Sequence, residues 1–126
     1  MKRIASITLV TLAAAFASSP LLADDYVAAY TCKLNEGKKV EDVQAANSAW
    51  LKWVRANVSE KITSNVGTAV VGQFDTFLFV DRYPDLATWA ETHMALQNDA
   101  PKELEANLDA AAKCTENRLW RMQPTP

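Results

Sequence analysis

The only histidine of the chain, His93, is the first candidate for chemistry. An imidazole titrates near neutral pH, so His93 is a candidate general base or, in a haem protein, an axial iron ligand. One histidine cannot build a zinc site alone, and no spacing of Cys, His and acidic residues predicts a metal site. The alternative is a half-buried histidine that makes a hydrogen bond on a helix and has no chemical role. The sequence contains no nucleophile elbow, phosphate loop or HExxH motif.

A set of mostly aromatic residues is the second candidate site. Alternation along the predicted strands places on one face Tyr26, Tyr30, Phe77, Phe79, Asp81, Arg118, Trp120 and Met122. Such a face suits the lining of a cavity for a flat apolar ligand, or the packing of a dimer interface. Asp81 and Arg118 would anchor the polar part of a ligand, or else form an ion pair worth little. The candidate ligand-binding residues are Tyr26, Tyr30, Phe77, Phe79, His93, Arg118 and Trp120.

The other face of the same strands carries compact side chains. They are Val27, Ala29, Thr31, Leu78, Val80 and Leu119. We expect this compact set to lie beneath the helices, because the helices already bring several large side chains to that space.

The first 23 residues have the layout of a secretory signal peptide. Lys2 and Arg3 precede an uncharged apolar run over 4–16, and small residues follow up to Ala23. The run is too short to serve as a comfortable membrane span. Cleavage after Ala23, or after Ala17 as the alternative, predicts a periplasmic or secreted protein with no membrane span in the mature chain.

Residues 24–126 are expected to form one domain. Without Lys2 and Arg3 the chain keeps 11 basic and 15 acidic residues, a net charge of −4. Nucleic-acid binding needs a basic surface, so this charge argues against a nucleic-acid partner, and equally against tight binding to anionic lipid.

Hydrophobic periodicity and turn residues divide the mature chain into strands and helices. Strands are predicted at 26–34, 67–73, 76–82 and 115–123, and helices at 40–57, 85–96 and 101–113. The polar segment 57–65 is predicted as a loop. Asp85 and Asp99 are the candidate N-caps of the second and third helices. Leu86, Trp89, His93 and Leu96 form the apolar stripe of the second helix.

This order, βαββαβ, predicts an α+β, ferredoxin-like fold: an antiparallel sheet with helices on one face and an extra short helix before the last strand. The first and last strands are then antiparallel neighbours, and Cys32 and Cys114 fall at adjacent ends of them. In an exported protein, two cysteines indicate one disulfide. We therefore predict a Cys32–Cys114 disulfide; the alternative is a nucleophilic cysteine with a second, spare thiol.

The third predicted strand is apolar on both faces, because its residues 77–80 read Phe-Leu-Phe-Val. A sheet with one open face should alternate apolar and polar residues. The second face is therefore expected to be covered, most simply by another copy of the chain.

The element order, the Phe-rich third strand and the run RYPDLATW at 82–89 resemble the dimeric α/β-barrel superfamily. This superfamily includes antibiotic-biosynthesis-monooxygenase-like, EthD-like and NIPSNAP-like proteins and haem-degrading monooxygenases. The resemblance covers nearly all of 25–123, and the two cysteines resemble an exported branch. It implies a homodimer packed through its sheets, with any ligand between sheet and helices. It includes no diagnostic catalytic motif, and fold does not transfer function.

Three functions remain open at this point. The first is an exported, disulfide-bonded homodimer that binds a small apolar molecule without catalysis and without a cofactor. The second is a monooxygenase-like enzyme, cofactor-independent or haem-linked, that uses a tyrosine or His93. The third is a protein-interaction module whose aromatic face is the interface. A cavity bounded by Tyr30, Phe79, His93 and Trp120 would favour the first two.

Overall fold

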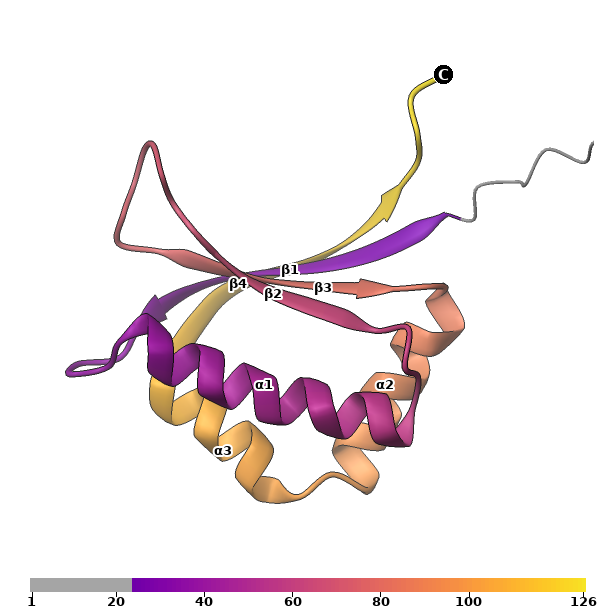
Figure 1. Ribbon diagram of the computed structural model, residues 1–126, viewed down its shortest axis with the longest axis horizontal. Coiled ribbons are helices and arrows are strands. Elements are labelled where there is room, and N and C mark those ends of the chain that lie inside the picture. The colour runs from indigo at the N-terminus through magenta and orange to yellow at the C-terminus, as the bar shows by residue number, and fades with distance from the viewer. Residues whose placement is uncertain (1–23) are drawn as a thin grey trace, which may run out of the picture.

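A computed structural model describes residues 24–126 as a four-stranded sheet with three helices on one side (Figure 1). The elements are β1 (Asp25–Leu34), α1 (Val40–Asn57), β2 (Thr63–Thr68), β3 (Phe77–Tyr83), α2 (Leu86–Asn98), α3 (Lys102–Ala111) and β4 (Ala112–Met122). The predicted signal peptide lies outside the described residues.

The sheet has the strand order β2-β3-β1-β4, and every neighbouring pair is antiparallel. With the helices on one face, this is the ferredoxin-like arrangement, so the predicted fold class is confirmed. β1 and β4 are neighbours, as the topology requires, and the short α3 precedes the last strand.

The predicted position of the second strand is wrong. β2 occupies Thr63–Thr68, so it begins in the segment predicted as a loop (57–65) and ends near the start of the predicted strand (67–73); residues 69–76 connect it to β3. Ser64 and Val66 pair with Asp81 and Phe79 on β3, so tertiary contacts outweigh the weak strand propensity of this segment. The stronger strand formers Val70 and Val71 are 87% and 89% exposed.

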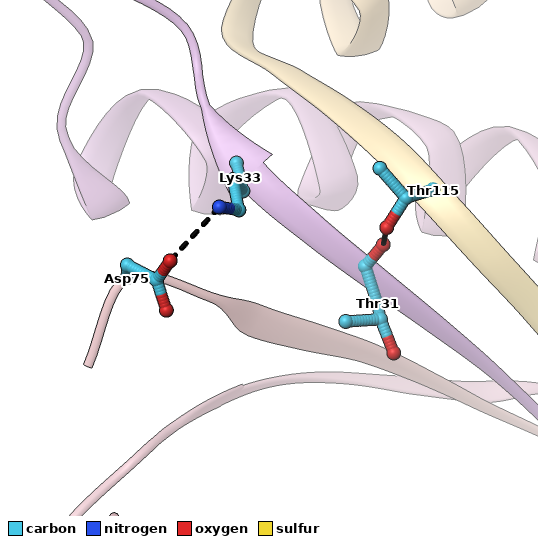
Figure 2. A network of polar contacts seen from close by, with 4 residues as sticks. All are labelled: Thr31, Lys33, Asp75 and Thr115. Atoms are coloured by element: carbon cyan, nitrogen blue, oxygen red, sulfur yellow. Dashed lines mark hydrogen bonds and ion pairs between the residues drawn. The ribbon is translucent and has the colours of Figure 1, made fainter. Parts of the chain in front are cut away.

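The connection over 69–76 rises from the side of the sheet opposite the helices (Figure 1). Its last part is fixed by an ion pair of 2.8 Å between Lys33 Nζ on β1 and Asp75 Oδ2, and Figure 2 shows the two side chains reaching toward each other. Nearby, the Thr115 hydroxyl donates to the Thr31 carbonyl, at the irregularity where the β1–β4 register shifts. Both side chains of the ion pair are more than half exposed, so the pair orients the loop more than it stabilises the fold.

The bounds of α1 and the N-cap of α2 agree with the sequence, whereas the N-cap and the end of α3 differ from it. α1 has the predicted bounds, and the Asp85 carboxylate caps α2 by accepting from the Thr88 backbone N–H at 2.7 Å. Asp99 is not the N-cap of α3: its own N–H closes the end of α2, and Pro101 takes the N-cap position. α3 also ends at Ala111, earlier than predicted, because β4 begins at Ala112 to pair with Leu34.

The face assignment of the strands is reversed for β1 and β3. Phe77, Phe79 and Asp81 are buried beneath the helices, whereas Leu78 is exposed. Register places four β1 residues on the helix side with them, namely Tyr26, Ala28, Tyr30 and Cys32. The compact residues of β1 and β3 therefore do not lie beneath the helices as predicted, whereas Leu119 of β4, paired with Ala28, does lie on the helix side.

Alternation separates the two faces of a strand but does not say which face the helices cover. α2 buries Thr88 and Thr92, while Leu86 of its predicted apolar stripe is half exposed. α1 adds Ala46 and Asn47. α1 also buries Trp50 and Val54, so large residues of the helices and of the sheet share this core. The prediction assumed large helix side chains and so assigned the aromatic face to the outside.

The Cys32–Cys114 disulfide is present, with the two Cα atoms 3.9 Å apart across the β1–β4 pair. Cys32 is fully buried and belongs to a core cluster with Val43, Phe77, Phe79, Ala111 and Ala112. The bond therefore ties the last strand to the core at the end of the sheet where α3 runs into β4.

Replacing both cysteines by serine is expected to lower the free energy of unfolding by about 4.5 kcal/mol in the chain-entropy model, because the bond closes a loop with a sequence separation of 82. Urea unfolding of the double variant and of the wild type, with and without reductant, measures this difference. Equal stability of the two proteins under oxidising conditions would contradict a stabilising Cys32–Cys114 disulfide.

Candidate functional site

A cavity of about 660 Å³ lies between the sheet and the helices. Tyr30 and Phe79 form its wall on the sheet, and Trp50 of α1, Leu96 of α2 and Leu108 of α3 form the opposite walls. Its volume lies in the range of pockets that enclose small organic molecules. These walls are aromatic and aliphatic, and polar side chains, including Glu105, Asp109 and Lys113, line other parts of the cavity.

The predicted ligand-binding residues divide into two groups. Tyr30, Phe79 and His93 line the cavity. Phe77 and Tyr26 share their side of the sheet but contribute to the core beside it. Arg118 and Trp120 pair with Ala29 and Val27, on the opposite face of the sheet, so grouping them with the others was wrong.

Asp81 places a carboxyl group in the sheet wall of the cavity, between Phe79 and Tyr83. The residue is 5% exposed, and the Ser64 hydroxyl of β2 donates to its Oδ1 atom. Ser64 Oγ in turn accepts from Asn47 Nδ2 of α1 at 2.8 Å. We call these three residues the Asn47–Ser64–Asp81 cluster. It joins one helix and two strands through hydrogen bonds.

The second carboxyl oxygen of Asp81, Oδ2, has no hydrogen-bond donor among the described residues. No fully buried side-chain oxygen of the described residues lacks a hydrogen-bond partner. Oδ2 is therefore not fully buried. Asp81 lines the cavity, and Oδ2 is the oxygen of its carboxyl group that no described residue occupies. The predicted Asp81–Arg118 pair is wrong. Arg118 lies on the other face of the sheet, where its Nη2 atom is 3.7 Å from Glu116 Oε2.

Burial raises the pKa values of Asp81 and of the two tyrosines that line the cavity, Tyr30 and Tyr83. Desolvation raises the pKa of Asp81 to about 6, and the Ser64 hydrogen bond opposes the shift without cancelling it. Burial, with the nearby Asp81 charge, raises the pKa of Tyr30 to about 12 and raises that of Tyr83 as well. Both phenols are therefore neutral at physiological pH, while Asp81 is mostly ionised there.

His93 is half buried at the edge of the cavity, as predicted for a residue between α2 and the sheet. Its Nδ1 donates to the Trp89 carbonyl at 2.9 Å, and the two rings lie 4.5 Å apart between centroids. The Nε2 atom has no hydrogen bond to another described residue. The Trp89 carbonyl also takes part in the backbone hydrogen bonds of α2. Removing the His93 ring therefore leaves no buried group without a hydrogen bond.

Sequence reasoning missed Asn47 and Ser64. Asn47 had one detectable signal, since it lies between Val43 and Trp50 on the buried stripe of α1. A polar residue on an apolar stripe needs a buried partner. Ser64 had none, because it was placed in a loop.

Comparisons with known proteins identify the fold. No family model and no curated protein matches the sequence. Among solved structures, the chain is similar to SnoaB, a cofactor-independent oxygenase from Streptomyces nogalater, with 10% identity, a TM-score of 0.56 and coverage of 82% of this chain and 97% of that one.

Two other solved structures support the same fold. A NIPSNAP family protein from Agrobacterium tumefaciens has 16% identity, a TM-score of 0.55 and coverage of 79% and 86%. A protein assigned to the antibiotic-biosynthesis monooxygenases, from Caulobacter crescentus, has 9% identity, a TM-score of 0.56 and coverage of 83% and 93%. The chain has the ferredoxin-like fold of the antibiotic-biosynthesis-monooxygenase and NIPSNAP proteins. The resemblance seen in the sequence is thus confirmed for the fold.

Asp81→Asn is expected to stabilise the protein at about pH 8, by up to about 3 kcal/mol, and to have little effect at about pH 4. The folded-state pKa of Asp81 lies above its ordinary value of 3.8, so its contribution to stability is full below that value and is lost as pH rises through about 6. The asparagine amide keeps an oxygen for Ser64 and carries no charge. Urea unfolding at both pH values measures the effect.

Asp99→Asn, at an exposed residue beyond α2, is the matched control and should change stability little at either pH. If Asp81→Asn is less stable than the wild type at about pH 8, other groups of the folded chain stabilise the ionised carboxylate, and the prediction is wrong.

Proposed function

We propose that this protein binds a small, largely apolar molecule in the cavity between its sheet and helices. The observation that carries this proposal is a cavity of about 660 Å³ with aromatic residues in its walls and the buried carboxyl group of Asp81 among them. Tyr30 and Phe79 together with Trp50 offer flat surfaces for a ring system. A pure interaction module would not need an internal space of this size.

We also propose that the domain works outside the cytoplasm after removal of residues 1–23. Disulfides persist in oxidising compartments, and the Cys32–Cys114 bond is buried on the Cys32 side. None of the helices in residues 24–126 is long and apolar enough to cross a membrane.

A homodimer that packs through the open sheet face is the third part of the proposal. Leu78, Trp120 and Met122 are 40%, 48% and 47% exposed on that face. Register places Val80 and Val27 between them on the same side. Apolar side chains on adjacent strands form a surface that is costly to leave in water.

Haem does not fit this cavity. His93 Nε2 is free to bind iron, with Nδ1 held by a carbonyl as in many haem and metal sites. The propionates of a haem need cationic or neutral donors, yet the cavity presents Asp81, Glu105 and Asp109, with Lys113 as its only lysine or arginine. A cofactor-free cavity suits these residues better. The described residues also hold no group of three or more potential metal ligands.

A cofactor-independent oxygenase is the second candidate, and the free Oδ2 of Asp81 favours it. Asp81 could take a proton from an acidic carbon or phenol, and the activated substrate would then be oxidised by dioxygen, one oxygen atom entering the product and the other leaving as water. SnoaB, which shares the fold, is described as such an enzyme. Oxygen uptake with bound ligand, absent in Asp81→Asn, would distinguish this enzyme from a binding protein.

Leu108→Trp is expected to weaken ligand binding at least about tenfold, because the larger side chain fills the cavity. Isothermal titration calorimetry with naphthylmethanol, a neutral flat probe, measures binding. Ala106→Trp on the exposed side of the same helix is the control and should bind as the wild type does. No binding of any ligand to the wild type, with native mass spectrometry of a periplasmic extract also showing none retained, would refute the proposal.

Leu78→Asp is expected to convert a wild-type dimer to monomer without unfolding it, because Leu78 lies on the open face. Phe79→Asp should instead unfold the chain, since Phe79 is buried beneath the helices. Sedimentation velocity and circular dichroism of the two variants distinguish these outcomes. A wild-type protein that stays monomeric at micromolar concentration would contradict the dimer.

A further inference from the structure

The buried carboxyl group of Asp81 has no counter-charge within the described residues. The ion pairs there join Lys33 to Asp75, Arg82 to Asp25, Arg118 to Glu116 and Arg121 to Asp24. None involves Asp81, whose only donor is the Ser64 hydroxyl. A buried charge is costly unless it is paired. A cation that binds beside Asp81 would therefore lower the free energy of this site.

The cationic side chain that shares the cavity lies too far along the sheet to be that partner. Lys113 pairs with Lys33, whereas Asp81 pairs with Ala28, five positions earlier on β1. At the rise of an extended strand this separation is about 17 Å. Lys113 lies at the disulfide end of the sheet and leaves Asp81 without a neighbour of opposite charge.

The remaining polar groups of the cavity also favour a cationic ligand. Glu105 and Asp109 of α3 line it together with Asp81, so carboxyl groups outnumber lysine and arginine side chains three to one. An anionic ligand would be repelled by this set. A neutral ligand would leave the Asp81 charge uncompensated.

The aromatic walls strengthen the same preference. Tyr30, Trp50, Phe79 and Tyr83 all line the cavity with Asp81. Aromatic faces attract cations as well as flat apolar rings, most strongly where water is excluded. A ligand with an aromatic body and a protonated amine therefore matches both the aromatic walls and the Asp81 carboxyl group.

We infer that the ligand is an aromatic amine, bound with its ammonium group on Asp81 Oδ2 and its ring system between the walls formed by Trp50 and Phe79. This inference rests on the proposed binding function and specifies the chemical class of its ligand. The Asn47 amide donates to the Ser64 hydroxyl, and this hydroxyl donates to Oδ1 of Asp81, so the carboxyl group is held in place. Oδ2 is left to the ligand.

Three probes that share one ring system test this inference: naphthylmethylamine, naphthylmethanol and naphthoate, titrated calorimetrically into the wild-type protein at about neutral pH. The amine should bind at least about tenfold more tightly than the alcohol, and the carboxylate most weakly. In Asp81→Asn the amine and the alcohol should bind with equal affinity. Asp99→Asn is the control and should keep the preference for the amine.

Each contrary result refutes a different statement. If the alcohol binds as tightly as the amine, the ligand class is wrong while the binding function stands. If the preference survives in Asp81→Asn, Asp81 is not the anchor. If no probe binds the wild type, both the ligand class and the proposed cavity function fail.

Discussion

The hydrogen bond from Ser64 to Asp81 is the interaction on which the site depends. It joins β2 to β3 and, through Asn47, ties both strands to α1. A core of apolar side chains in the same place would be more stable, because an ionised carboxylate without a cation is expensive to bury. Retaining Asp81 is understandable if the site is incomplete until a ligand supplies the opposite charge.

The disulfide has the complementary role at the other end of the cavity. Cys114 lines the cavity, and its bond to the buried Cys32 fixes the start of β4 against the core. The junction between α3 and β4 is also held by Asn35, whose side-chain amide donates to the Asp109 and Ala110 carbonyls and whose backbone N–H donates to the Ala111 carbonyl. A domain of this size has little stability to spare. The covalent bond thus allows a cavity in a core that would otherwise need to be filled.

The sequence was informative wherever a local pattern determines the structure. The apolar spacing of α1 predicted both of its ends, and the strand order predicted that Cys32 and Cys114 would meet. Alternation in β3 correctly separated Phe79 from Leu78, but it cannot say which set the helices cover. That choice depends on how the helices pack on the sheet, which involves residues far apart in the sequence.

The candidate site was only partly predictable, for the same physical reason. Tyr30, Phe79 and His93 were found because aromatic and imidazole side chains are conspicuous in a sequence. The Asn47–Ser64–Asp81 cluster comes from three elements, and the register that aligns Ser64 with Asp81 has no local signal. Trp120 was grouped with the site because the pairing of β4 with β1 could not be derived from alternation alone.

Carbon-13 NMR titration of the Asp81 carboxyl group, in the free protein and with saturating naphthylmethylamine, tests most directly whether this buried charge awaits a cation. Burial without a counter-charge predicts a pKa of about 6 for Asp81 in the free protein. A bound ammonium group stabilises the carboxylate, so the pKa should fall when the amine is added. An Asp81 pKa at its ordinary value in the free protein, or one that the amine leaves unchanged, would contradict this explanation.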